Sequence, residues 1–201
     1  AGGYTECEEC PSGFYTNHMQ LNFECTPCSR GKWSGLTGAT SILNCSDCEA
    51  GKYSNREGVQ TVGECQNCLP GYWSNVVGAD EESFCLACEP GRMSNTATGR
   101  STLCDDCDAG KFKLESASKT PCESCPVGYF QTNISQSFCK TCSTGYYQDV
   151  DTQTECKICP KGYYQSVIAQ TDCKHCKTGT YQNEIGQPIC LQCIAGKYSD
   201  Q

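Results

Sequence analysis

The chain has 201 residues, a formal net charge of −8 and a pI near 4.8, and an acidic surface of this kind repels phosphate backbones and anionic lipid. Nucleic acid is therefore not expected as a partner, and membrane insertion is not expected because no apolar run approaches the roughly 18 residues of a spanning helix. Leu, Ile, Val and Phe supply only 28 residues, whereas 22 cysteines indicate a scaffold held by cross-links or metals.

Every cysteine belongs to a Cys-x-x-Cys pair, and eleven pairs follow one another from Cys7/Cys10 to Cys190/Cys193. The first cysteines of successive pairs are 17 to 20 residues apart. A short fixed period is typical of stacked repeats rather than of one globular core. We therefore interpret 1–201 as one continuous array of about eleven repeats, with longer copies over about 7–106 and shorter copies over about 107–201.

Each copy continues after its second cysteine with x-x-Gly-x-aromatic, usually followed by Ser or Gln. Glycine fills its position in every copy, which indicates positive φ or a close backbone approach: Gly13, Gly31, Gly51, Gly71, Gly91, Gly110, Gly128, Gly145, Gly162, Gly179 and Gly196. We expect the aromatic, one per copy, to pack on a disulfide and on the ring of the next copy: Tyr15, Trp33, Tyr53, Trp73, Phe112, Phe130, Tyr147, Tyr164, Tyr181 and Tyr198, with Met93 as the exception.

The rest of each copy is polar and rich in turn residues, and no segment has helical periodicity over a useful length. A second glycine marks another turn in the longer copies, at Gly38, Gly58, Gly78 and Gly99. The predicted fold class is a small disulfide-rich repeat. It would form an elongated, solenoid-like rod of short β-hairpins and turns, with little regular secondary structure and no helices of note.

Zinc and disulfides compete as the cross-links. Two successive pairs overlap the spacing of a four-cysteine zinc ribbon, but eleven pairs would form five such sites and leave one pair over. The sequons at Asn44 and Asn133 make these residues candidate glycosylation sites and fit an extracellular protein. We therefore expect disulfides, with no bound metal and no cofactor.

Three disulfide connectivities are open on the sequence. A bond inside one pair closes a small, strained ring. A bond from the second cysteine of one pair to the first of the next encloses one hairpin, in a loop that contributes roughly 3 kcal/mol. Bonds from first to first and from second to second across two copies would double the period and strand one pair.

The pattern Cys-x-x-Gly-x-Tyr-Ser, clearest at 48–54 and 193–199, resembles the ephrin-receptor-like cysteine-rich repeat. It is also similar to the first module of tumour-necrosis-factor-receptor domains. The resemblance covers the whole chain, although receptors of these families interleave different modules and this chain has one kind. It implies a secreted or cell-surface rod whose disulfides are of the Cys10–Cys25 type, formed by Cys10, Cys25, Cys28, Cys45, Cys48, Cys65, Cys68, Cys85, Cys88, Cys104, Cys107, Cys122, Cys125, Cys139, Cys142, Cys156, Cys159, Cys173, Cys176 and Cys190.

That linkage leaves Cys7 and Cys193 without partners inside the chain. If a second copy followed Gln201, Cys193 and the next Cys7 would be 15 residues apart, within the 14 to 17 of the internal loops. We therefore predict an inter-unit disulfide between them, so that copies of the chain or flanking repeats continue the rod end to end as an open filament. A fragment of a longer array is the alternative.

Other side chains give weaker signals. His18 and His175 sit in no catalytic or metal motif, and the acidic clusters Glu6/Glu8/Glu9, Asp80/Glu81/Glu82 and Asp105/Asp106/Asp108 lack the pattern of a calcium loop. We interpret these clusters as solvated charge. The residue between the glycine and the aromatic should point outward, so Tyr129, Tyr146 and Tyr163 are candidates for an exposed ladder that meets a lateral protein or glycan. Edge packing between copies is the alternative.

The sequence favours an extracellular structural protein, a disulfide-stapled rod that forms or belongs to a secreted or cell-surface filament. The alternative is the ligand-binding or adhesive stalk of a receptor-like ectodomain, and no enzymatic activity is expected. The sequence has no initiator Met and no signal peptide, so we expect the export signal to have been removed or to lie on a longer parent chain.

Overall fold

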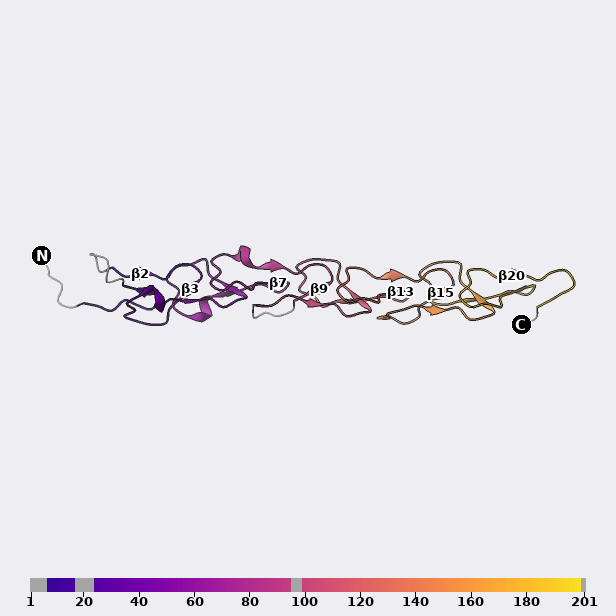
Figure 1. Cartoon of the computed structure of the whole chain (residues 1–201), viewed down its shortest axis with the longest axis horizontal. Helices are drawn as coiled ribbons and strands as arrows, with labels where there is room; N and C mark the ends of the chain where they lie inside the picture. Colours follow the sequence, from indigo (N-terminus) through magenta and orange to yellow (C-terminus); the bar gives the residue numbers. More distant parts are fainter. Residues whose placement is uncertain (1–6, 17–23, 95–98, 200–201) are drawn as a thin grey trace. The chain divides into compact units, whose positions relative to one another are not determined.

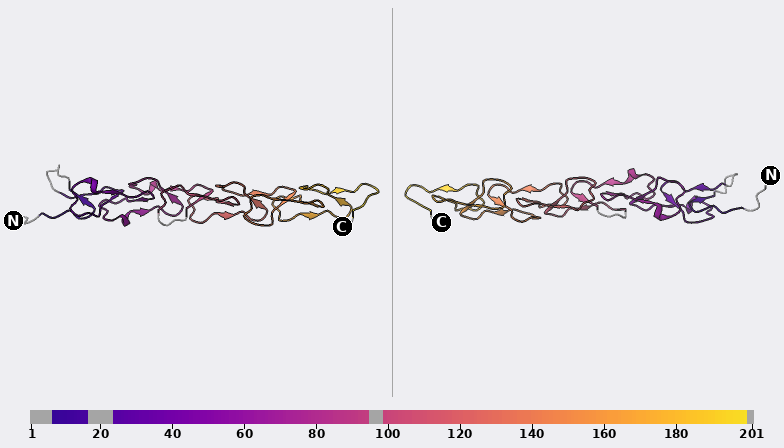
Figure 2. Two further views of the ribbon diagram at one scale, coloured as in Figure 1. Left: turned by 60° about the horizontal axis from the view of Figure 1, so that its bottom comes forward. Right: turned by 180° about the vertical axis from the view of Figure 1, so that it is seen from behind.

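The repeats form short antiparallel hairpins in the computed structural model, which describes residues 7–16, 24–94 and 99–199. The first strand of each hairpin is the pair of residues after the motif glycine, and the second strand is the pair of residues between the next two cysteines. Within each part of the chain, Figure 1 shows these hairpins following one another in chain order, and Figure 2 gives two further views. The predicted fold class, a small disulfide-rich repeat of hairpins and turns, is confirmed.

The chain divides into two units, and each builds its hairpins in the same way. Unit 1 consists of Ala1–Cys88, Ser94–Cys104 and Ala117–Thr120, and unit 2 of Glu89–Met93, Asp105–Ser116 and Pro121–Gln201. In unit 1 the paired strands are β1 (Phe14–Tyr15) with β2 (Thr26–Pro27), β3 (Lys32–Trp33) with β4 (Ser46–Asp47), β5 (Lys52–Tyr53) with β6 (Gln66–Asn67), and β7 (Tyr72–Trp73) with β8 (Leu86–Ala87).

Unit 2 contains six further hairpins among its described residues. They pair β9 (Arg92–Met93) with β10 (Asp105–Asp106), β11 (Lys111–Phe112) with β12 (Glu123–Ser124), β13 (Tyr129–Phe130) with β14 (Lys140–Thr141), β15 (Tyr146–Tyr147) with β16 (Lys157–Ile158), β17 (Tyr163–Tyr164) with β18 (Lys174–His175), and β19 (Thr180–Tyr181) with β20 (Leu191–Gln192).

One disulfide closes each hairpin loop. Ten bonds join the second cysteine of one pair to the first cysteine of the next, from Cys10–Cys25 to Cys176–Cys190, across separations of 14 to 17 residues. This is the linkage that the family resemblance implies. Cys7 and Cys193 are free thiols.

The loops differ between the longer and the shorter copies. Three long loops of unit 1 each contain one turn of 3₁₀ helix, η1 (Ile42–Asn44), η2 (Val62–Glu64) and η3 (Glu82–Phe84). In η1 the Ser41 hydroxyl accepts from the Leu43 N–H, while the Asn44 side chain accepts from the Ser41 N–H, so a reciprocal cap fixes the turn. The described loops of unit 2 between β11 and β20 have no such turn.

The core is built mainly from sulfur and polar side chains, joined in unit 1 by Ala39, Val59 and Ala79, rather than from the aromatic rings. The second cysteine of every pair from Cys10 to Cys159 is at most 3% exposed. The residue after the aromatic is also buried, as Ser34, Ser54, Ser74, Ser94, Lys113, Gln131, Gln148, Gln165 and Gln182. Among the motif aromatics, Tyr53 is buried, Tyr181 and Tyr198 are exposed and the others are half-buried. The ring contact found in the described residues joins Tyr163 to His175, so the expected packing of one motif ring on the next is not seen. The interior faces loop backbone, whose N–H and C=O groups need hydrogen-bonding partners that a ring cannot supply.

Each repeat is hydrogen-bonded through its backbone to the next. Around Cys142, the Gly145 N–H donates to the Gln165 carbonyl at 2.7 Å, the Gln148 N–H to the Gln170 carbonyl at 3.0 Å, and the Cys142 carbonyl accepts from the Ala169 N–H at 2.9 Å. The same three bonds recur in most other repeats, in both units. At a net stabilisation of about 1 kcal/mol per bond, they amount to roughly 3 kcal/mol for each step of the array.

A closer contact joins each repeat to the one after the next. A Cβ atom added to Gly145 would lie within 3.0 Å of the backbone carbonyl of Gly186, which belongs to the loop two repeats later. Gly145 also has φ +82° and Gly186 φ +69°, conformations that favour glycine. The repeated glycine thus does what the sequence predicts, since it has both positive φ and a close backbone neighbour.

Replacing Gly145 by alanine should therefore destabilise more than replacing Gly162, which has φ +83° but nothing within 4 Å of the added Cβ. Both variants carry the conformational cost of about 1–2 kcal/mol, and Gly145→Ala adds a clash of about 1–3 kcal/mol. Hydrogen exchange of the Gly186 N–H, which donates to the Cys159 carbonyl, and the urea midpoint of the disulfide-intact protein measure the difference. Equal losses in the two variants would contradict the contact.

Candidate functional site

The recurring feature of this molecule is a contact surface that a repeat presents to a loop two repeats later. We call this surface the seat, and it consists of the motif glycine, the residue after it and the partner of that residue on the paired strand. We call the positive-φ residue of that loop the loop residue. The loop residues have φ between +52° and +74°, although four of them are not glycine: Gly38, Gly58, Gly78, Gly99, Ala117, Ser135, Thr152, Ala169 and Gly186. From Gly58 onward each one lies against the motif glycine of the repeat two positions earlier, as Gly58 does with Gly13 and Gly186 with Gly145.

The floor of each seat consists of the residue after the motif glycine and its partner on the paired strand. The Cβ position of Gly186 lies 3.3 Å from Ile158 Cγ2 and 3.8 Å from Tyr146 Oη, and Tyr146 pairs with Ile158 across β15 and β16. In unit 1, the Cβ position of Gly58 lies 3.2 Å from the Phe14 ring. Phe14 and Tyr146 occupy equivalent places, so both units use the same floor.

The structure gives the burial and the neighbours of the tyrosine row. Tyr129, Tyr146 and Tyr163 are half-buried rather than exposed. Tyr146 lies beside the loop of Gly186, and the Tyr163 ring lies 4.1 Å from the His175 ring, centroid to centroid. The outward ladder predicted from strand alternation is corrected in this respect, because a two-residue strand is too short to keep a side chain clear of the loop that packs on it. Contact with a later copy is seen at Tyr146, whereas Tyr163 contacts His175 of its own hairpin.

In some seats an ion pair joins the residue after the motif glycine to its partner on the paired strand. Lys32 pairs with Asp47, and Arg92 Nε lies 2.8 Å from Asp106 Oδ1. In each case the cation follows the motif glycine and the carboxylate is the second residue between the next two cysteines. Asp47 also lies beside the Cβ position of Gly78, the loop residue that this seat receives.

Buried glutamines fix the loops of unit 2. Gln148 Nε2 donates to the Glu155 carbonyl at 2.7 Å, and Gln148 Oε1 accepts from the Val150 N–H at 3.2 Å. Gln131, Gln165 and Gln182 make the same pair of bonds. In unit 1 the shorter Ser54 reaches only Arg56, accepting from its N–H and donating to its carbonyl, each at 3.3 Å. Sequence reasoning noted Ser or Gln at this position but missed its role, for which the signal was the switch from Ser to Gln where the loops shorten.

Ionisable groups in these repeats show small, local effects. The hydrogen bond from Lys157 lowers the pKa of Asp149 below its usual value, and the same bond raises the pKa of Lys157. Both groups are exposed, and the pair is lost as the pH falls through the lowered pKa of Asp149 or rises through the raised pKa of Lys157. Burial, followed by the nearby Glu82 carboxylate, raises the pKa of Tyr53 and favours its neutral phenol. None of these groups forms a catalytic constellation with another.

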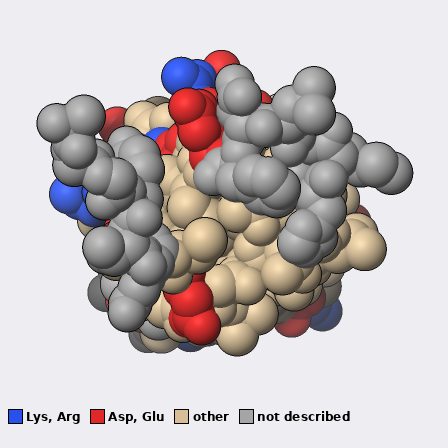
Figure 3. Space-filling model, turned by 90° about the vertical axis from the view of Figure 1, so that its left-hand side faces the viewer, with Lys and Arg blue, Asp and Glu red and all other residues tan. Residues whose placement is uncertain are grey.

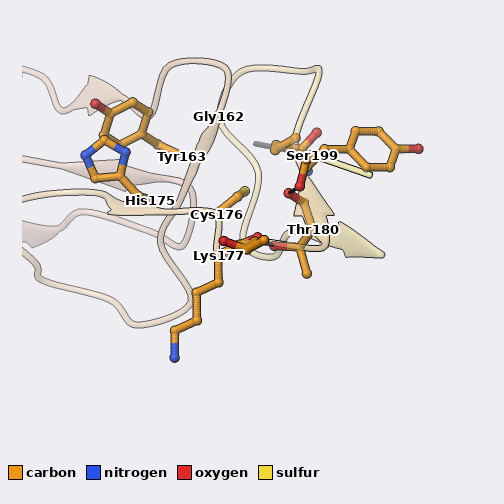
Figure 4. A pocket seen from close by; sticks show the side chains of 10 residues that line it. Gly162, Tyr163, His175, Cys176, Lys177, Thr180 and Ser199 are labelled. Carbon is orange, nitrogen blue, oxygen red and sulfur yellow. Dashed lines mark hydrogen bonds between the residues drawn. The ribbon is translucent and has the colours of Figure 1, made fainter. Parts of the chain in front are cut away.

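A pocket of about 470 Å³ in unit 2 opens beside Gly162, Tyr163 and His175 (Figure 4). Figure 4 shows the Tyr163 and His175 rings together on one side, with Thr180 and Ser199 on the other. Ser199 Oγ donates to the Thr180 carbonyl at 2.9 Å and accepts from the Gly179 N–H at 3.1 Å. Gly162, Tyr163 and His175 are the counterparts of Gly145, Tyr146 and Ile158, so the pocket has the parts of a seat.

The remaining predicted residues are placed as follows. Cys7 is exposed and Cys193 half-buried. Asn133 is exposed, whereas Asn44 is half-buried and its side chain caps η1, so Asn133 is the more accessible candidate for a glycan. His18 and Glu6 lie outside the described residues. Over the described ranges, no three His, Cys, Asp or Glu side chains are grouped to hold a metal ion, and no helix has the length and apolar character to cross a bilayer.

Four stretches of the chain match the family described as tyrosine-protein kinase ephrin type A/B receptor-like, at residues 1–45, 114–151, 145–178 and 168–201. Together they cover about two thirds of the sequence. The chain belongs to the ephrin-receptor-like family of cysteine-rich repeats. Repeats of this family are non-catalytic ectodomain modules, and the chain is accordingly a receptor-like ectodomain segment of an extracellular or cell-surface protein. No curated protein matches the chain.

Replacing Gln148 by methionine should loosen its loop. Methionine keeps the length of the side chain but removes both hydrogen bonds, so the free energy that opens the Val150 N–H should fall by about 2 kcal/mol. Native-state hydrogen exchange of Val150 measures this. The matched control is Gln170→Met, because the Gln170 side chain donates only to the exposed Ile168 carbonyl. If the two variants protected Val150 equally, the glutamine would not fix the loop.

Proposed function

We propose that this protein is an extracellular structural element, a disulfide-stapled repeat array that forms or belongs to a secreted or cell-surface filament. One observation carries the proposal: the same seat, with the same backbone bonds, recurs along both units. A surface specialised for one ligand would need some repeats to depart from the others.

The free thiols support an open-ended assembly. Cys7 and Cys193 hold the two positions at which the disulfide series would continue beyond this chain. A bond between Cys193 of one copy and Cys7 of the next would have a separation of 15 residues, which equals that of Cys107–Cys122. The partners proposed are therefore copies of this chain or flanking repeats of the same kind. A head-to-tail contact that does not close into a ring extends as a filament.

A receptor-like stalk is the second candidate, because the family is named for receptors. Exposed apolar side chains on the loops of unit 2, such as Ile134, Ile168 and Ile185, at 54% to 56% exposure, would be available to a lateral protein partner. In that function the chain would present a ligand-binding surface and remain monomeric. The two candidates therefore differ in the state of association of the pure protein.

Assembly of the purified chain in an oxidising glutathione buffer tests the proposal. We expect electron microscopy to show particles that lengthen with concentration and time, and non-reducing peptide mapping to find Cys7 linked to Cys193 of another copy. Cys193→Ser should remove the covalent link and leave the ten internal disulfides intact. Monomers with both thiols free at every concentration would favour the stalk instead.

A further inference from the structure

The last three repeats offer seats that nothing in the described chain fills. Added Cβ atoms on Gly162, Gly179 and Gly196 would have no neighbour within 4 Å, although these glycines keep φ of +82° to +83°. Every motif glycine before them, from Gly13 to Gly145, lies against a later loop. The hydrogen bonds from a loop residue to the second cysteine of the preceding repeat end at the same point of the chain. In the described residues, the last of them joins the Gly186 N–H to the Cys159 carbonyl.

The first empty seat keeps the floor of a filled one. Tyr163 pairs with His175 across β17 and β18 in the register that Tyr146 and Ile158 use under Gly186. The pocket beside these rings is the space that a loop residue occupies one repeat earlier. A loop backbone with positive φ is therefore the ligand that this pocket is shaped to receive.

The first repeat of unit 1 has the complementary feature. The Cβ position of Gly38 lies 3.2 Å from the Glu9 carboxyl carbon, as that of Gly78 lies beside Asp47. Glu9 thus occupies the place that Asp47 and Asp106 hold in complete seats, where each pairs with a cation. Across the described residues, no basic side chain forms an ion pair with Glu9. Figure 3 shows acidic side chains, together with some basic ones, around an uncharged area on this face of the molecule.

The missing cation is present on the last repeat. Lys197 follows the motif glycine Gly196, which is the position of Lys32 and Arg92 in the complete pairs, and it is exposed. Lys174 and Lys177 of the same unit are also exposed, as are Asp172 and Glu184, and the exposed Glu8 precedes Glu9 in the sequence. Lys197 and Glu9 carry opposite charges, and such a pair favours one face binding the other over either binding itself.

We propose that the face of unit 2 formed by Gly162, Tyr163, His175 and Lys197 binds the first repeat of a second copy of this chain, in the register that sets Lys197 opposite Glu9. The proposal rests on the proposed function and names the contacts that would join successive copies.

Reversal of the charges of Lys197 and Glu9 tests the register. It is made in the Cys7→Ser/Cys193→Ser protein, which cannot form the disulfide between copies. Self-association is measured by sedimentation velocity at low salt. Lys197→Glu or Glu9→Lys alone should weaken it about fivefold, because each sets like charges opposite one another, and the double variant should restore it. Gly162→Ala should abolish association, since its Cβ would meet the bound loop. Gly63→Ala is the control, because Gly63 is exposed and only its own Thr61 side chain lies near.

Each result separates this inference from the filament itself. Association that is restored in the charge-exchanged protein and lost in Gly162→Ala supports the docking. If Lys197→Glu, Glu9→Lys and Gly162→Ala all form filaments as the parent protein does, the docking is overturned and the proposed structural function is unaffected. Complexes that follow the charge pattern but stop at two copies would support the docking and contradict a filament. Absence of association at any concentration overturns the docking.

Discussion

A disulfide at every repeat closes the loop of one hairpin, and the remaining contacts depend on that closure. The chain has too few aliphatic residues for an apolar core, and strands of two residues give each hairpin only a few backbone bonds. A closed loop of about 15 residues contributes roughly 3 kcal/mol. The conformational cost of ordering the same residues, near 1.5 kcal/mol each, is roughly 22 kcal/mol and therefore much larger. A single repeat is therefore not expected to fold alone, and stacking must supply the remainder.

Stacking in this protein is largely a matter of backbone. Gly145 donates to the next repeat and lies against the loop of the one after it, so three consecutive repeats define each seat. The loop residue Ala169 keeps φ +57° in spite of its side chain, which indicates that the seat imposes this conformation. An interface of this kind has no natural end, because each new repeat completes earlier seats and opens others. This property links the fold to the proposed assembly.

Much of the fold followed from spacing, because cysteine and glycine positions constrain the backbone directly. The pairs defined the repeats, Gly145 and its equivalents marked positive φ, and the family resemblance implied the linkage seen at Cys10–Cys25. Burial was harder to predict. Hydrophobicity favoured the aromatics as the core, yet Gln148 is 2% exposed because its amide can satisfy the backbone around it. The contact between Gly145 and Gly186 could not be predicted either, because these residues lie two repeats apart and the sequence period does not indicate which repeats touch.

The stacking of the repeats depends on how the cysteines are connected. Non-reducing peptide mapping of the native protein, after cleavage within the polar loops, should find ten bonds that each join the second cysteine of one pair to the first of the next, with Cys7 and Cys193 outside this series. Bonds within a single Cys-x-x-Cys, or bonds from first to first and second to second cysteine, would contradict it, because neither closes the hairpin loop on which the stacking depends.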